Sequence, residues 1–86
     1  MNFRFSNHAL EEMGKRKIPI SFVEAVLKNP QQILPQDEEI TIYQSQIDFG
    51  TDKLYLLRIF INITLDPAIV VTVYRTSQIK KHWRNP

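Results

Sequence analysis

Apolar and polar residues alternate through the second half of the chain, as they do in strands with one buried face. Three segments carry this pattern, at residues 40–47, 54–63 and 69–74. The middle segment is the longest, and we predict that one apolar row faces the core: Tyr55, Leu57, Ile59, Ile61 and Ile63. Short turns, one of them at residues 48–52, separate the segments, so consecutive strands are expected to pair antiparallel.

The beginning of the chain has the spacing of amphipathic helices instead. Leu10 and Met13, three positions apart, give a first helix its apolar line. Ser6 or Asn7 is placed to cap the start of this helix, because a short polar side chain there accepts a hydrogen bond from a free backbone N–H. We expect the helix to end near residues 15–17.

A second helix is expected to open with a capping box, in which Ser21 is followed by Glu24 three residues later. Asn29 and Pro30 should end it, since proline cannot continue a helix. Its apolar stripe is expected to contain Phe22, Val23, Val26 and Leu27.

The pattern therefore predicts an α+β protein, in which two N-terminal helices pack on a three- to four-stranded antiparallel sheet. A short C-terminal helical turn is expected at residues 77–83. Phe3 and Phe5 alternate with Arg4 in a brief strand-like start. A chain of 86 residues has room for one domain, which we place at residues 1–86.

Composition narrows the class of protein. The chain is 43% hydrophobic, which is enough for one thin core. It has no cysteine, which excludes disulfides, thiolate metal sites and cysteine nucleophiles. No segment has the ~20 consecutive apolar residues of a membrane span, and the first residues lack the apolar run of a signal peptide. We therefore expect a cytoplasmic protein without membrane contact.

The net charge is only +2, but basic residues gather near the C-terminus. Residues 67–86 contain no acidic side chain and four basic ones, which are Arg75, Lys80, Lys81 and Arg84. A basic segment of this kind either meets a phosphate-bearing partner or forms a solvated tail. The charge pattern leaves both interpretations open.

The strand pattern also places polar side chains on the sheet face away from the helices. Arg58 interrupts the apolar middle strand and points opposite to its apolar row. With Val71 and Val73 assigned to the core, three more side chains should share the face of Arg58: Thr72, Tyr74 and Thr76. A guanidinium on such a face either binds phosphate or lies over the sheet beside an acid.

Three stretches of the chain resemble a known family. They are FSNHALEEM at residues 5–13 with RKIP at 16–19, VLKNP at 26–30, and VYRTSQIKKHW at 73–83. Together they resemble the family of domains of unknown function numbered four-two-five-eight. Its members read H-A-x-x-R-M-x-x-R-x-I near the start and V-Y-x-T-S-K-I-x-K-Y-W at the end. The resemblance spans nearly the whole chain.

That family is similar to the group of small folds that includes barnase-like and RelE-like ribonucleases. The resemblance implies metal-independent endoribonuclease activity, with RNA as substrate, and a toxin that is neutralised by an antitoxin-like protein partner. It implies His8 as general base or acid, with Arg58 and Lys80 as the other catalytic residues. The substrate-binding residues that it implies are Arg16, Tyr74, Thr76 and Ser77.

Three positions depart from the family pattern. Glu12 stands in place of the usual arginine, Gln78 in place of the usual lysine, and His82 in place of the usual aromatic residue. The first two departures each remove a cation from a phosphate site. They favour the alternative that the chain is a non-catalytic RNA- or protein-binding module with the same fold.

Each candidate residue also has a structural interpretation. His8 and Glu12 form a surface pair or a cap contact, Thr76 and Ser77 cap the terminal turn, and Tyr74 packs. Arg16 caps the first helix and Lys80 is solvated. We expect no metal or other cofactor, because two histidines 74 positions apart and two glycines supply neither a ligand set nor a phosphate loop. No sequence feature indicates an oligomeric state.

Overall fold

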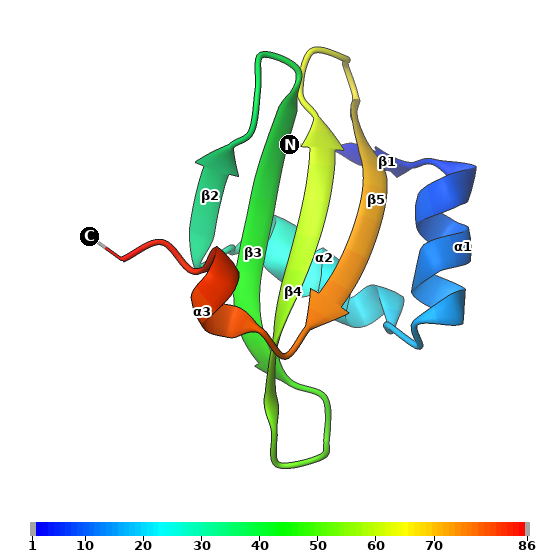
Figure 1. Ribbon diagram of the computed structural model, residues 1–86. Coiled ribbons are helices and arrows are strands. Elements are labelled where there is room, and N and C mark those ends of the chain that lie inside the picture. Colours follow the sequence, from blue (N-terminus) through cyan, green and yellow to red (C-terminus); the bar gives the residue numbers. More distant parts are fainter. Residues whose placement is uncertain (1, 86) are drawn as a thin grey trace.

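The computed structural model describes residues 2–85 and confirms the mixed α+β class (Figure 1). Within these residues, three helices and five strands follow one another. Their bounds are β1 Phe3–Phe5, α1 Asn7–Lys15, α2 Ile20–Lys28, β2 Gln32–Pro35, β3 Ile40–Asp48, β4 Leu54–Asn62, β5 Ala68–Thr76 and α3 Ile79–His82. Within the described residues no helix is long and apolar enough to cross a membrane.

The sheet has five strands in the order β1-β5-β4-β3-β2, so the expected three- to four-stranded antiparallel sheet was wrong in two respects. The four strands β2 to β5 are antiparallel, but β1 pairs with β5 in parallel. β2 was missed because it has four residues and ends at Pro35, which only an edge strand tolerates. The parallel partner of β1 lies more than 60 residues along the chain, beyond what local patterns indicate.

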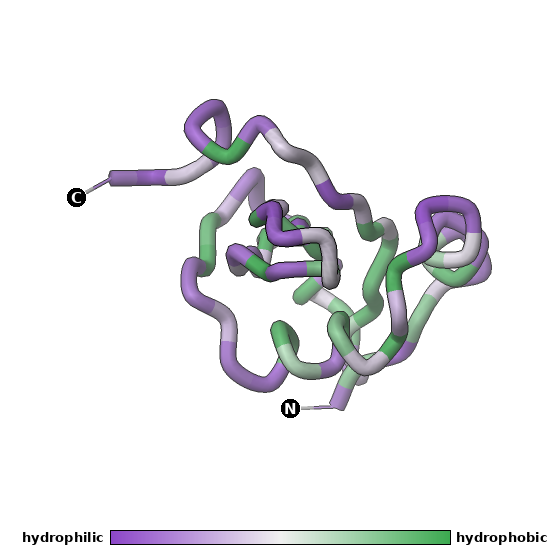
Figure 2. Tube along the Cα trace, turned by 90° about the horizontal axis from the view of Figure 1, so that it is seen from below, coloured by the Kyte–Doolittle hydropathy of each residue, from purple (hydrophilic) through white to green (hydrophobic). Residues whose placement is uncertain are grey.

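Helices lie on different sides of this sheet. In Figure 1, α2 runs behind the strands, α1 stands beside β5, and α3 crosses in front of β3 and β4. Figure 2 looks along the strands and shows the C-terminal segment on the side opposite to the N-terminus. Helices α1 and α2 contribute to the main apolar core, whereas α3 contributes no buried residue.

The main core confirms most of the predicted apolar row. Leu57, Ile59 and Ile61 are fully buried beneath the helices. Tyr55 is half-buried, and Ile63 lies outside β4 and is 47% exposed. The prediction of a buried row is therefore correct at the centre of the strand and wrong at its two ends.

A β-bulge corrects the prediction for the last strand. Val73 lies in the core as expected, but Val71 is only half-buried. The register of β5 against β4 shifts between Phe60 and Ile61, so that Ile61 pairs with Val70 rather than Val71. An extra residue in one strand reverses the alternation beyond it, and Val70 takes the core position.

Helix caps were predicted correctly for one helix and wrongly for the other. Ser6 caps α1, because its Oγ accepts a hydrogen bond from the N–H of Ala9 at 3.0 Å. The same Oγ donates to the carbonyl of Val71 at 3.1 Å, which ties the helix to β5. The capping box of Ser21 was wrong, since α2 begins one residue earlier, at Ile20, with no side-chain cap.

Candidate functional site

Four polar side chains form a row across the sheet, in register on the face away from α2. Gln32 of β2 is the pairing partner of Gln44 of β3, which pairs with Arg58 of β4, which pairs with Tyr74 of β5. We call these four residues the polar row. Register alone places them on one face, because residues directly opposite in neighbouring strands point to the same side.

Arg58 is the centre of the row and is only 8% exposed. Its Nε donates to Oε1 of Gln44 at 2.9 Å, and its Nη1 donates to the hydroxyl of Tyr74 at 2.7 Å. The same Nη1 lies 3.0 Å from Nδ1 of His82 in α3. Since arginine carries only donors, Nδ1 must accept this bond, and a neutral His82 therefore carries its proton on Nε2.

No carboxylate pairs with Arg58 among residues 2–85. The one ion pair in this part of the chain joins Arg16 to Glu12, at 3.7 Å. An arginine has five N–H donors, and the two on Nη2 make no hydrogen bond within the described residues. Because no fully buried side-chain nitrogen or oxygen there lacks a partner, Nη2 must reach the solvent. Arg58 is thus a nearly buried cation with one free edge.

Hydrogen bonds continue along the row to the edge of the sheet. Gln44 is fully buried, and its Nε2 donates to Oε1 of Gln32 at 2.7 Å and to the carbonyl of His82 at 3.1 Å. Gln32 in turn bonds the backbone of Arg84, with Nε2 donating to the carbonyl at 2.6 Å and Oε1 accepting from the N–H at 3.2 Å. The two glutamines therefore orient Arg58 and hold the end of the chain against the sheet.

Aromatic rings and a second cation surround the other end of the row. The ring of Tyr74 stacks on Phe60 with centroids 5.8 Å apart. Arg58 lies 5.8 Å from the centre of the Tyr74 ring, and Arg16, at the end of α1, lies 5.9 Å from it. Two guanidinium groups therefore approach one half-buried ring, although 42 positions separate them in the sequence.

His82 is held in its neutral form beside this cluster. Its pKa is lowered from the ordinary value of 6.5, first by burial and then by the positive charges of Arg58 and Lys81. Both causes disfavour a second cation at this place. A neutral imidazole next to a guanidinium is one ingredient of metal-free acid–base chemistry.

The structure brings together only some of the residues implied by the family resemblance. Arg58, Tyr74 and Arg16 meet around the Tyr74 ring. His8 is exposed in the first turn of α1 and makes no described contact with this cluster, and Glu12, the partner considered for it, pairs with Arg16 instead.

The remaining candidates lie between the end of β5 and the first turn of α3. Thr76 accepts a hydrogen bond from the N–H of Gln78 at 3.1 Å through its Oγ1, but α3 has no side-chain cap, so the cap expected from Thr76 or Ser77 was wrong. Ser77 and Lys80 are exposed. The catalytic set of His8, Arg58 and Lys80 is therefore not assembled by the contacts of the described residues.

Sequence reasoning missed two members of the cluster. Gln44 was an unremarked polar residue within a strand, and His82 was left without a role. The available signal for Gln44 was that it is a polar residue on a strand expected to lie next to the strand of Arg58. Only the strand register shows that the two residues are paired. His82 lies at the position where the family usually has an aromatic residue. The chain turns back over β4 before it reaches His82, and no sequence pattern near this residue indicates that contact.

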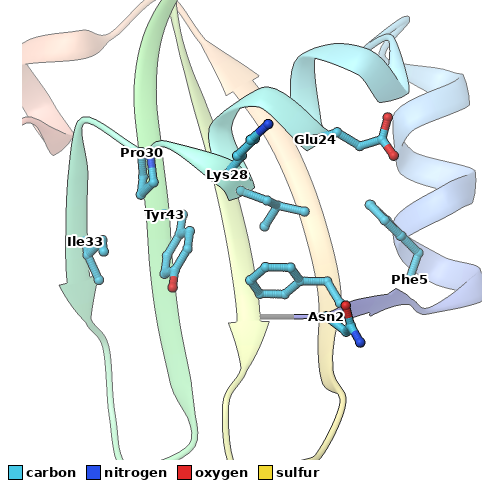
Figure 3. Close-up of a pocket in the computed structure, with 9 residues that line it drawn as sticks. Asn2, Phe5, Glu24, Lys28, Pro30, Ile33 and Tyr43 are labelled. Atoms are coloured by element: carbon cyan, nitrogen blue, oxygen red, sulfur yellow. The ribbon is translucent and has the colours of Figure 1, made fainter.

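A separate cavity of about 530 Å³ lies on the other face of the sheet. Figure 3 shows Ile33 and Tyr43 along one side of it and Phe5 along the other, with α2 at one end. Apolar side chains dominate its lining, and Glu24 and Lys28 lie at its rim. Within the described residues there is no group of three His, Cys, Asp or Glu side chains that could hold a metal ion.

Fold and site together define a small mixed α+β protein with an arginine-centred polar row on one sheet face. The family model described as "Domain of unknown function (DUF4258)" matches residues 5–75, so the chain belongs to this family. The match ends within β5, so α3 and most of the closing stretch at residues 73–83 lie beyond it. Comparisons with curated proteins and with solved structures found no match.

Proposed function

We propose that the chain binds RNA, with a backbone phosphate held at the free edge of Arg58. The observation that carries this proposal is a nearly buried guanidinium with no carboxylate partner and with Nη2 open to solvent. Burying an unpaired charge is costly, and a phosphate supplies the missing counter-charge through charge-assisted hydrogen bonds.

The surroundings of Arg58 suit a polynucleotide better than a lone anion. Tyr74 places an aromatic ring beside two cations, and aromatic rings and cations are the groups with which proteins bind single strands. Arg16 adds a second cation that is about half exposed. Lys80 and Lys81 are exposed on α3 above the same face and attract a polyanion over longer distances. RNA is also the substrate implied by the likeness to barnase-like and RelE-like proteins.

Metal-independent cleavage of RNA is a second candidate, and the neutral His82 beside Arg58 favours it. In this candidate His82 replaces His8 as the base that takes the 2′-OH proton. Its Nδ1 would exchange the hydrogen bond from Arg58 for one from the 2′-OH and would take that proton as the 2′-oxygen attacks phosphorus. Arg58 would stabilise the charged phosphorane, and a water molecule would protonate the 5′-oxygen as its bond to phosphorus breaks. The likeness to RelE-like proteins adds a toxin role and a neutralising protein partner to this candidate.

The test of RNA binding is fluorescence anisotropy of a labelled mixed-sequence single-stranded RNA at several salt concentrations. Arg58→Gln should weaken binding about tenfold and flatten the slope of log K against log salt by roughly 0.7. Lys28→Gln on α2 removes one exposed cation from the other side of the sheet and should change little. Equal losses in the two variants would contradict a phosphate contact at Arg58. Circular dichroism shows whether each variant remains folded.

The test of cleavage uses the same RNA in excess chelator. Cutting by the wild type that is lost in His82→Ala and Arg58→Gln but kept in His8→Ala would support the second candidate. Loss in His8→Ala would instead support the residues that the family resemblance implies. Intact RNA with the wild type rules out cleavage of free RNA, and a repeat with ribosomes then tests ribosome-dependent cutting.

A further inference from the structure

The end of the chain occupies the polar row. Residues 79–85, which we call the C-terminal segment, make four hydrogen bonds to it. His82 contacts Arg58 through Nδ1 at 3.0 Å and Gln44 through its carbonyl at 3.1 Å. Arg84 contacts Gln32 through its backbone N–H at 3.2 Å and its carbonyl at 2.6 Å. Every one of these bonds ends on a side chain of the row.

Apolar packing holds this segment only weakly. Helix α3 has no buried residue, and Ile79 and Trp83 are only half-buried. Figure 2 shows that the segment is mostly hydrophilic. Helix α2, by comparison, inserts three buried side chains into the core. Regions with little apolar burial open at a small fraction of the global unfolding free energy, so the C-terminal segment can leave the sheet while the core stays folded.

The segment and a phosphate need the same donors. A bidentate contact to phosphate uses N–H groups on two guanidinium nitrogens. In the docked state Nε of Arg58 is taken by Gln44, and Nη1 is shared between Tyr74 and His82. Only Nη2 is open. Release of His82 would free one N–H of Nη1 next to the two on Nη2.

We propose that the C-terminal segment is autoinhibitory: its His82 occupies Nη1 of Arg58, which a bidentate phosphate contact needs beside the free Nη2, and the segment is displaced when RNA binds there. This proposal rests on RNA binding as the proposed function. It assigns His82 and Gln32 to the control of access rather than to contact with the ligand. When the docked state dominates, the apparent affinity for RNA is lowered by the fraction of molecules that are open.

Point variants of the full chain can loosen the segment without removing a cation. Gln32→Ala deletes both bonds to Arg84, and His82→Ala deletes the bond to Nη1 of Arg58. Each should bind labelled single-stranded RNA about three- to tenfold more tightly than the wild type, because the open fraction rises. Gln31→Ala is the matched control, since among residues 2–85 its side chain bonds only the backbone of Gln46.

Trp83 reports displacement directly, because it is the only tryptophan of the chain and lies in the segment. RNA should shift its emission maximum to longer wavelength in the wild type, and Gln32→Ala should show part of this shift without RNA. Unchanged or weaker binding by both loosened variants would overturn autoinhibition alone, provided that Arg58→Gln binds RNA about tenfold more weakly than the wild type. Binding by Arg58→Gln that is as tight as that of the wild type, or no binding by any of the proteins, would overturn the proposed function as well.

Discussion

Gln44→Leu should destabilise the protein, although it puts an apolar side chain of similar size at a fully buried position. Ordinarily such a change in a strand is neutral or favourable. Here Oε1 of Gln44 is the only described acceptor for Nε of Arg58, at 2.9 Å. Leucine would leave a donor of a nearly buried cation without a partner. A buried donor without a partner destabilises the folded state more when it belongs to a charged group than when it belongs to a neutral one.

The magnitude follows from which bonds are lost. The bond to Arg58 is charge-assisted and is worth about 1.5–3 kcal/mol. The bonds from Gln44 to Gln32 and to the carbonyl of His82 involve half-buried groups that water can reach, so they add little. We therefore expect a loss of about 2–3 kcal/mol in the free energy of unfolding. For a domain of this size each kcal/mol lowers Tm by about 4–8 °C, so Tm should fall by roughly 10–20 °C.

Urea unfolding followed by circular dichroism measures this loss, with Gln46→Leu as the control. Gln46 lies two residues along the same strand, is half-buried, and bonds through its backbone N–H, which the substitution keeps. It should change stability by less than about 0.5 kcal/mol. If the two variants lose equal stability, the pairing of Gln44 with Arg58 does not stabilise the fold and the energetic role given to the polar row is refuted.

Three further expectations follow from the fold. Ser6→Ala should cost about 1 kcal/mol by removing the cap of α1. Ser21→Ala should change stability by less than about 0.5 kcal/mol, because that residue is exposed within α2 and caps nothing, and denaturant midpoints compare the two variants. Val73→Ala should cost about 2–3 kcal/mol, from two methyl groups and the cavity they leave. Val71→Ala should cost less than about 1 kcal/mol, and equal losses would contradict the bulge. NMR titration should give His82 a pKa below 6.5, because burial disfavours its charged form. The folded state then binds fewer protons than the unfolded chain, so the stability that His82 contributes is full above about pH 6.5 and falls as the pH drops below it.

Local patterns were sufficient for most of the elements, though not for β2, and for one face of the sheet. The alternation around Ile59 identified β4 and its buried side, and it placed Arg58 on the opposite side together with Tyr74. These predictions succeeded because each depends on the two-residue period of a single strand. The structure confirms the shared face and adds that Arg58 and Tyr74 are direct neighbours across β4 and β5.

What local patterns missed depends on contacts between distant parts of the chain. The bulge at Val71 adds one residue to β5, and no composition signal marks it. The role of His82 arises because the chain turns back over the sheet after β5, so that residues 24 positions apart come within 3.0 Å. The resemblance implied His8 as the base, but α1 stands beside β5 and leaves His8 away from Arg58. Spacing in the sequence cannot distinguish these two histidines.

The charge of Arg58 is the feature that a purely structural role leaves unexplained. Holding the C-terminal segment against the sheet does not require a cation, since Gln32 alone makes two hydrogen bonds to the segment through a neutral side chain. Apolar or neutral residues often replace buried charges with no loss of stability. Arg58 instead keeps its charge nearly buried, satisfied in part by three neutral acceptors, while Nη2 stays open. An incoming phosphate would gain most at such a position, because the desolvation cost of the cation has already been met in the folded protein.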